Sequence, residues 1–300
     1  MNLILSFLMI SVFILGNSFA EEFNGEDMKN TWQDIWSDGH ELLLVDLPSN
    51  TAKRKVYKTE GGYHLTIEHR RFSSIDNVVA FTVGNFGHPP LADSLYISKD
   101  NVEVERIGNS INGLLNLVGI LNGHRILLAG ENIRVNNGVF VQEKTAQDKD
   151  YFFIFNYETK ELKKLVDLGN LTLGMENGVC AGNLIAYGIK GGVRTYNVDS
   201  KASVDIDFEG DLDAISPDGE NLLLRNEEGY FVINSDGQNK QVVLSKRQIK
   251  KVTPIFDGYF ELRFQSWSPD GKFILFGESS DRNEGKRFLL NLETKELTKI

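Results

Sequence analysis

Short apolar runs recur along the chain, and each follows a tight polar turn. The two clearest copies are residues 216–219 (Ser-Pro-Asp-Gly) before the run 222–224, and residues 267–271 (Trp-Ser-Pro-Asp-Gly) before the run 273–276. In such a turn proline presets φ, aspartate caps the turn and glycine takes a positive φ, so these side chains are structural. A tight turn that leads into a buried strand, used more than once, predicts a repeat architecture.

Weaker copies of the turn and its apolar run lie upstream, at residues 76–81, 122–128 and 181–187. The runs align on five positions that lie roughly 40 to 60 residues apart, near the length of a propeller blade; these are Val79, Ile126, Ile185, Leu222 and Ile274. The interval from Ile126 to Ile185 is the longest and the most irregular.

A second unit follows most copies and consists of an alternating strand, a polar turn and another strand. Such hairpins are predicted over residues 42–57, 95–107, 151–166, 231–244 and 288–300, with a further one in the region 187–208. The turn, its two strands and the outer hairpin together make a four-stranded antiparallel blade. The predicted fold class is therefore all-β, a β-propeller of four-stranded antiparallel blades, with six blades favoured and five or seven left open.

Residues 24–39 show apolar positions at helical spacing, among them Trp32 and Trp36. We favour a short helix or an irregular lead-in here. The alternative takes residues 36–39, Trp-Ser-Asp-Gly, as a decayed first copy of the turn. With either structure, Trp32 and Trp36 are expected to cover blade ends, and both are candidates for a partner-binding face.

The first twenty residues have no charged side chain and one long apolar run, followed by small residues and an acidic pair. This pattern is typical of a secretory signal peptide. The alternative is a transmembrane anchor. A span needs roughly 18–20 apolar residues and basic flanks, and the apolar run here is shorter and has no basic flanks. The predicted organisation is a signal peptide at 1–20, a lead-in at 21–39 and a propeller at 40–300. We expect a periplasmic or secreted protein with no stable membrane anchor after cleavage.

Charge and cysteine content narrow the possible partners. The chain of 300 residues has a formal net charge of −10, which argues against nucleic-acid binding. Basic clusters at 53–55, 70–71 and 246–251 are interpreted as solvated hairpins or edge strands. Cys180 is the only cysteine, so no intramolecular disulfide can form, and its apolar neighbours indicate a buried structural thiol.

No catalytic motif stands out, because the chain has no Gly-x-Ser-x-Gly elbow and no phosphate-cradling glycine loop. His88 lies in a Gly-His-Pro-Pro segment typical of an exposed loop and is a third candidate for a binding face. His124 occupies a turn position and is expected to be solvated. No cofactor is predicted.

The acidic segment 204–214 is the sharpest candidate for a metal site. Read as a calcium loop, it lacks the bidentate glutamate at its last position and the flanking helices. Read as strand, it alternates acidic and apolar residues, which is the interpretation we favour. Asp211 and Asp213 would then begin an inner strand at the central channel, where paired carboxylates could hold a cation such as calcium.

The phrase Ser-Pro-Asp-Gly followed by an apolar run resembles the repeats of TolB-like, WD-repeat-like β-propellers. The segment 285–292, which follows the second copy, resembles them too. The resemblance is good over 209–300 and approximate over 40–208. It implies the fold and an envelope or cell-surface setting. TolB itself has an α/β domain before its propeller, and the present pattern shows no such domain, so TolB's partners are not carried over.

Three functional hypotheses follow. The first is a non-enzymatic propeller that binds a protein or peptide as a scaffold in the cell envelope or outside the cell. The second is a propeller enzyme, a lyase or hydrolase with a site at the central channel that acts with or without a metal ion. The third is an accessory sensor-like domain with a small ligand. Fold alone does not decide among them.

Overall fold

The structure is a computed structural model of the chain. It describes residues 33–37, 41–46, 51–58, 71–73, 78–83, 94–99, 103–111, 116–130, 133–143, 151–165, 178–253, 255–256, 259–260, 262–278 and 286–300. The predicted signal peptide, Trp32 and His88 lie outside the described residues.

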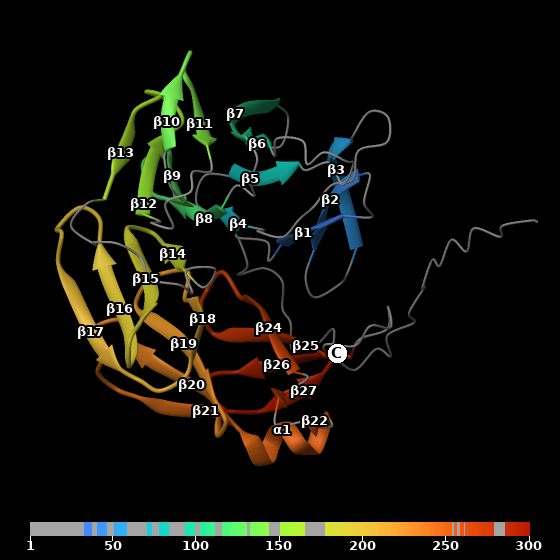
Figure 1. The fold of residues 1–300 in the computed structure, drawn as a ribbon. Coiled ribbons are helices and arrows are strands. Elements are labelled where there is room, and N and C mark those ends of the chain that lie inside the picture. The colour runs from blue at the N-terminus through green and yellow to red at the C-terminus, as the bar shows by residue number, and fades with distance from the viewer. Residues whose placement is uncertain are drawn as a thin grey trace, which may run out of the picture. The chain divides into compact units, whose positions relative to one another are not determined.

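Four sheets have the four antiparallel strands expected of a blade, with the strands in chain order across each sheet (Figure 1). The third sheet contains β8 (Asn116–Leu121), β9 (Arg125–Gly130), β12 (Tyr151–Asn156) and β13 (Leu162–Lys164). The fourth contains β14 (Val179–Ala181), β15 (Leu184–Ile189), β16 (Gly192–Asn197) and β17 (Ser203–Asp207). The fifth contains β18 (Asp211–Ile215), β19 (Asn221–Asn226), β20 (Gly229–Asn234) and β21 (Gln241–Ser245). The sixth contains β24 (Leu262–Trp267), β25 (Phe273–Glu278), β26 (Arg287–Asn291) and β27 (Leu297–Lys299).

Two further sheets precede these. The first sheet pairs β1 (Gln33–Ser37), β2 (Glu41–Asp46) and β3 (Thr51–Lys58). The second contains four antiparallel strands, β4 (Arg71–Ser73), β5 (Val78–Val83), β6 (Ser94–Lys99) and β7 (Glu103–Ile111), with two more strands added beyond β7. The fold is an all-β propeller, and its described residues contain five sheets with four antiparallel strands in blade order and a first sheet of three strands. All the predicted hairpins and all the predicted apolar runs after turns are present as paired strands.

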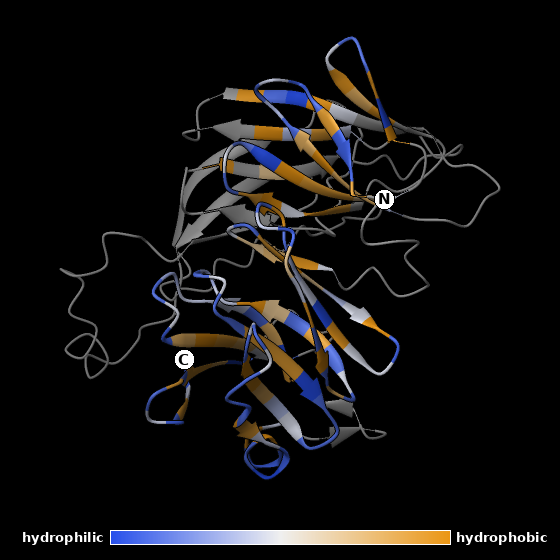
Figure 2. Cartoon of the chain, turned by 90° about the vertical axis from the view of Figure 1, so that its left-hand side faces the viewer, coloured by the Kyte–Doolittle hydropathy of each residue, from blue (hydrophilic) through white to orange (hydrophobic). Residues whose placement is uncertain are grey.

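The strands form because their apolar residues meet those of the next sheet. The second strands are largely buried, as in β9 and β25, where the central residues are all inaccessible. Figure 2 shows apolar residues concentrated in the strands and polar residues in the turns. Four apolar clusters join the second sheet to the third, the third to the fourth, the fourth to the fifth and the fifth to the sixth. The first strands also follow one another, since β4 contacts β8, β8 contacts β14 and β14 contacts β18.

A hairpin inserted in the third sheet explains the irregular interval between Ile126 and Ile185. Its strands are β10 (Ile133–Asn136) and β11 (Val139–Glu143), which lie between β9 and β12 in the sequence. β11 then pairs in parallel with β7, the last strand of the preceding sheet. The Phe140 ring is fully buried against Gly108, where any Cβ would overlap it. The hairpin therefore ties the third sheet to the edge of the second.

The N-terminal pattern was interpreted wrongly where it can be checked. Residues 33–37 form strand β1 instead of part of a helix, because pairing with β2 outweighs a local spacing that fits either structure. Trp36 pairs with Leu43 as Trp267 pairs with Ile274. This matching register favours the alternative in which residues 36–39 are a decayed copy of the turn.

The basic cluster at 246–251 is also a correction, because it forms a helix and not a hairpin or edge strand. Helix α1 (Lys246–Val252) lies between β21 and β24 and is followed by a small hairpin of β22 (Ile255–Phe256) and β23 (Tyr259–Phe260). Ser245 and Gln248 form a capping box that initiates the helix. Among the described residues, no helix is long and apolar enough to cross a membrane.

Candidate functional site

The repeated turn is held by its serine as well as by its aspartate. In the first copy Ser216 Oγ donates to Asp218 Oδ1 (2.5 Å) and accepts the backbone N–H of Asn221 (2.9 Å). Asp218 Oδ1 also accepts the N–H of Glu220. Ser216 is 1% exposed, and Gly219 takes a φ of 78°, a conformation that favours glycine.

The second copy repeats these bonds atom for atom. Ser268 Oγ donates to Asp270 Oδ1 (2.6 Å) and accepts the N–H of Phe273 (2.8 Å), and Gly271 has a φ of 71°. The structural role predicted for the turn residues is confirmed. The serine had been overlooked, although it stands first in both copies of the phrase.

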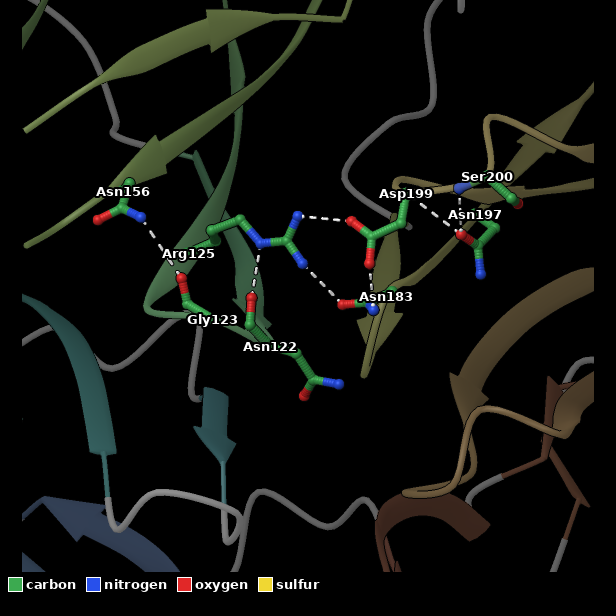
Figure 3. A network of polar contacts seen from close by, with 8 residues as sticks. All are labelled: Asn122, Gly123, Arg125, Asn156, Asn183, Asn197, Asp199 and Ser200. Atoms are coloured by element: carbon green, nitrogen blue, oxygen red, sulfur yellow. Dashed lines mark hydrogen bonds and ion pairs between the residues drawn. The ribbon is translucent and has the colours of Figure 1, made fainter. Parts of the chain in front are cut away.

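A polar network joins the turns of the third and fourth sheets (Figure 3). Arg125 donates to Asp199 Oδ1 (2.9 Å), to Asn183 Oδ1 (2.8 Å) and to the carbonyl of Asn122 (2.6 Å). Asn183 in turn donates to Asp199 Oδ2 (2.6 Å). Because these bonds satisfy the guanidinium from within the protein, the network fastens two blades together and leaves Arg125 little capacity for a ligand.

The antiparallel order of the strands gives each blade two different ends. At one end, a turn joins the first strand to the second and another joins the third to the fourth, as at residues 216–220 and 235–240. We call this the turn end. The backbone bond from Asn122 to Gly182 (2.9 Å) shows that these turns lie together in neighbouring sheets. The opposite end, the connection end, carries every described element outside the four-strand pattern, namely β10–β11, α1 and β22–β23.

The first strands of three sheets have a β-bulge at the same place. The register against the second strand skips Val118 in β8, Asp213 in β18 and Gln265 in β24. A bulge leaves one residue unpaired and redirects its side chain. In the sixth sheet the facing position is Gly277, where a Cβ would overlap the Gln265 amide. In the fifth sheet the equivalent position is Arg225.

Asp211, Asp213 and Arg225 form a charged cluster at the connection end of the fifth sheet. Arg225 Nε lies 3.1 Å from Asp213 Oδ2, and its second terminal nitrogen lies 2.9 Å from Asp211 Oδ2. The side chains of Arg225 and Asp213 are 15% and 19% exposed, while that of Asp211 is 58% exposed. The acidic segment forms strand as expected, but as two strands of neighbouring sheets, β17 and β18, separated by residues 208–210. Asp211 and Asp213 both lie in β18, the first strand of the fifth sheet.

Burial and ion pairing compete at this cluster. Burial raises the pKa of Asp213, and Arg225 lowers it by less, so the pKa remains above its ordinary value. Burial also lowers the pKa of Arg225, but Asp213, Tyr230 and Asp211 raise it by more, so the guanidinium stays charged. Burial therefore makes these charges unfavourable in free energy unless they stay paired with one another.

The sixth sheet completes the cluster. Arg263, an exposed residue of β24, lies close enough to Asp213 to lower the pKa of that carboxyl. Tyr230 is inaccessible and donates its hydroxyl to the carbonyl of Leu262 (2.7 Å), which binds β20 to the first strand of the next sheet. We call Asp211, Asp213, Arg225 and Arg263 the inner-strand cluster. Its charges of both signs can bind a polar group of either charge.

The sequence predicted a cation at Asp211 and Asp213, and the geometry adds a competitor for it. Arg225 already binds an oxygen of each carboxylate. Within the described residues, no three His, Cys, Asp or Glu side chains are grouped so that they could hold a metal ion. The cation site stays a prediction.

Of the three binding-face candidates only Trp36 is among the described residues, and it is not part of this cluster. Trp36 is placed in β1, far along the chain from the cluster, and nothing described defines a face around it. His124 lies in the turn of the third sheet, with its side chain 47% exposed and Nδ1 3.2 Å from the Tyr157 hydroxyl. Cys180 is only partly buried and its thiol donates to the carbonyl of Ile120 (3.7 Å), as a structural thiol would.

Solved structures with a similar fold come from several kinds of protein. TolB from Acinetobacter baumannii matches with a TM-score of 0.55 and 13% identity over 88% of this chain and 62% of TolB. A nidogen/laminin complex matches with a TM-score of 0.52 and 12% identity, covering 88% and 91% of the two chains. An oligogalacturonate lyase in complex with manganese matches with a TM-score of 0.50 and 15% identity, covering 87% and 75%.

These matches support the fold and go no further. The chain spans 62% of the TolB structure, less than two thirds of its length. No family model matches the sequence, and no curated protein matches it. The expected resemblance to TolB-like propellers is confirmed at the level of fold.

Proposed function

We propose that the mature chain is an exported, non-enzymatic β-propeller that binds a protein or peptide partner in the cell envelope or outside the cell. The observation that supports this most is the inner-strand cluster. Its charged groups lie on the first strands β18 and β24 and on the second strand β19, which pack against neighbouring sheets, and a rigid mount keeps binding groups in place.

The chemistry of the cluster suits a peptide better than a metal-assisted reaction. Arg225 is held in place by two carboxylates, and the exposed Arg263 adds a donor for a partner's carboxylate. Asp211, more than half exposed, can accept a partner's N–H or ammonium group. One of the similar structures is itself a protein complex, that of nidogen with laminin.

A charge reversal at the exposed end of the cluster tests this function. The mature chain, residues 21–300, is immobilised and presented with envelope extract, alongside the variants Arg263→Glu and Lys272→Glu. Lys272 is the matched control because it belongs to the same sheet but lies in the turn at the opposite end, with its side chain 72% exposed. We expect one or more proteins to bind the native chain and Lys272→Glu, and to be lost with Arg263→Glu. Retention on Arg263→Glu would contradict binding through this end.

A metal-assisted enzyme is the second candidate, and it is favoured by Asp211 and Asp213 alone. The similar oligogalacturonate lyase is in complex with manganese. A cation at these carboxylates would have to displace Arg225 from them. Calcium and manganese titrations of the native chain and of Asp211→Asn, followed by melting temperature, test this site. An unchanged melting temperature in the native chain would remove this candidate.

A further inference from the structure

Helix α1 gathers positive charge on one exposed side. Lys246, Arg247, Lys250 and Lys251 make up four of its seven residues, and none is acidic. At about 100° per residue, these four lie within roughly 140° of arc. Ile249, which is inaccessible, and Val252, which packs against the same core, lie on the opposite side. The helix is thus anchored by its apolar side and presents its basic side.

The four basic side chains have no structural task in the part of the chain that the structure describes. None of them forms a hydrogen bond or an ion pair there, and only the backbone N–H of Lys246 is engaged, by the carbonyl of Glu228 (2.6 Å). Arg125 and Arg225 differ, because each binds carboxylates of the protein. In a chain with a net charge of −10, four positive charges on one helix with no ion-pair partner among the described residues form a surface that can attract an anionic ligand from outside the chain.

The helix is well fixed for a role in recognition. The capping box of Ser245 and Gln248 holds its start, and the backbone bond from Thr253 to Ile249 (3.0 Å) holds its end. Lys250 and Lys251 in the last turn are favoured by the helix dipole. Because α1 leads from β21 to β24, it lies at the connection end, the same end of the blades as the inner-strand cluster.

We propose that the basic side of α1, Lys246, Arg247, Lys250 and Lys251, is a docking surface for an acidic segment of a partner protein. The apolar residues of α1 are committed to the core, so the helix has none to insert into a lipid surface. An extended anionic surface would also meet the acidic remainder of the chain, whereas a short acidic segment meets the helix alone. This inference rests on the proposed function, in that it takes the ligand to be a protein.

Peptide binding to charge-altered variants tests the surface. The probe is a fluorescent peptide of about twelve residues in which glutamate alternates with serine, and binding is followed by anisotropy at low salt and at about 0.15 M salt. We compare the native mature chain with the variant Lys246→Gln, Arg247→Gln, Lys250→Gln and Lys251→Gln. The control carries Lys163→Gln and Lys272→Gln, two exposed lysines away from α1. A second comparison uses Glu227→Gln with Glu228→Gln, which removes exposed negative charge beside the start of α1.

The proposal predicts saturable binding to the native chain that weakens with salt. The α1 variant should lose about tenfold or more in affinity, because it removes all four positive charges of the surface. The lysine control should bind within about twofold of the native chain, and the glutamate variant should bind more tightly. Absence of peptide binding, or equal losses in the α1 variant and the control, would overturn the proposal. Binding to vesicles of anionic lipid but not to the peptide would assign the surface to membranes instead.

This experiment and the capture from envelope extract fail separately. The peptide assay depends on α1 and not on Arg263. If extract proteins are captured through Arg263 while the peptide does not bind, the proposed function stands and the α1 surface falls. If the peptide binds but no extract protein depends on Arg263, the α1 surface stands and the role of the inner-strand cluster falls.

Discussion

At the scale of the residue, one position of the repeat is given different chemistry in different blades. The bulge of the first strand carries an apolar, an acidic or an amide side chain, and the facing residue of the second strand is matched to each (Val118 with Ala129, Asp213 with Arg225, Gln265 with Gly277). The backbone of the propeller is conserved across these sheets while the groups at its connection end vary. A charged pair in one blade can therefore arise without disturbing the strands that hold it.

The pH dependence of stability should show the burial of Asp213. Because its folded pKa is raised, the folded state binds a proton more tightly than the unfolded state. The contribution of Asp213 is thus most favourable below the ordinary pKa of about 3.9 and is lost as the pH rises through the raised value. We expect the unfolding free energy of the native chain to rise relative to that of Asp213→Asn as the pH falls from about 7 to about 4. Urea unfolding at a series of pH values measures the difference.

Asp205 is the control for this measurement because its pKa is shifted in the opposite direction. The ion pair with Arg194 lowers the pKa of this exposed carboxyl. Its contribution is present above the ordinary pKa and is lost as the pH falls through the lowered value. The unfolding free energy of the native chain should therefore fall relative to that of Asp205→Asn as the pH falls. The same sign of change in both variants would contradict the assigned pKa shifts.

At the scale of the element, the inserted hairpin β10–β11 depends on one glycine of the neighbouring sheet. The Phe140 ring lies on Gly108 of β7 and packs edge to face against Phe155 of the third sheet, with ring centroids 5.3 Å apart. A second link runs from Lys160 to Glu105 (2.6 Å), from a turn of the third sheet to β7. The hairpin, the third sheet and β7 therefore form one packed unit.

A methyl group at Gly108 should disrupt this unit. We expect Gly108→Ala to lower the unfolding free energy by about 1–3 kcal/mol, because the buried Phe140 ring has no free space to move into. Gly188→Ala is the matched control, since nothing lies within 4 Å of its Cβ position, and it should change stability by no more than about 0.5 kcal/mol. Denaturant unfolding measures both.

A smaller side chain at position 140 should relieve the clash. In the background Phe140→Leu, the effect of Gly108→Ala should shrink, because the two positions are in contact and their effects are coupled. An effect of Gly108→Ala that is the same in both backgrounds would show that the ring does not rest on this glycine.

At the scale of the whole molecule, protection should fall from the inner strands to the outer ones. The second strands β9, β15, β19 and β25 each contain at least three buried residues, and the fourth strands β13, β17, β21 and β27 at most two. Hydrogen exchange measured by mass spectrometry should show the slowest exchange in the second strands and the fastest in the fourth. Uniform exchange across a sheet would contradict this order. Because β7 is covered by β11, we expect it to exchange more slowly than the other fourth strands.

The repeats could be predicted from the sequence because every blade uses the same local signals. The turn phrase and the polar turns between alternating strands identify hairpins without any long-range knowledge. The polar turn between the third and fourth strands has a further local signal in three of the sheets. There Asn156, Asn197 and Asn291 each accept two N–H groups of the turn that follows. The lysine four residues after each of them has a φ near 60°. This Asn-to-Lys spacing would have identified the turns independently.

The departures from the repeat were harder to predict. A seven-residue helix such as α1 is too short to show a periodic apolar pattern, and its capping box is its clearest sign. The parallel pairing of β11 with β7 joins segments that no turn connects. The link between Asp213 and Arg225 depends on a bulge that shifts the register by one residue, which the alternation of the strand conceals. Side chains that share a site only through such a shift are invisible to spacing rules.

The seating of β11 beside β7 also changes what the molecule offers to other copies of itself. Without the hairpin, β7 would present nine residues of unpaired backbone, a long template for edge-to-edge aggregation. With it, residues 108–111 of β7 are paired with β11, and this part of the sheet ends at the four residues of β10, whose exposed side includes Arg134. A short edge strand with a charged side chain is a poor template for a further strand. The insertion that interrupts the repeat thus shortens the longest edge at which an acidic, disulfide-free propeller could self-associate.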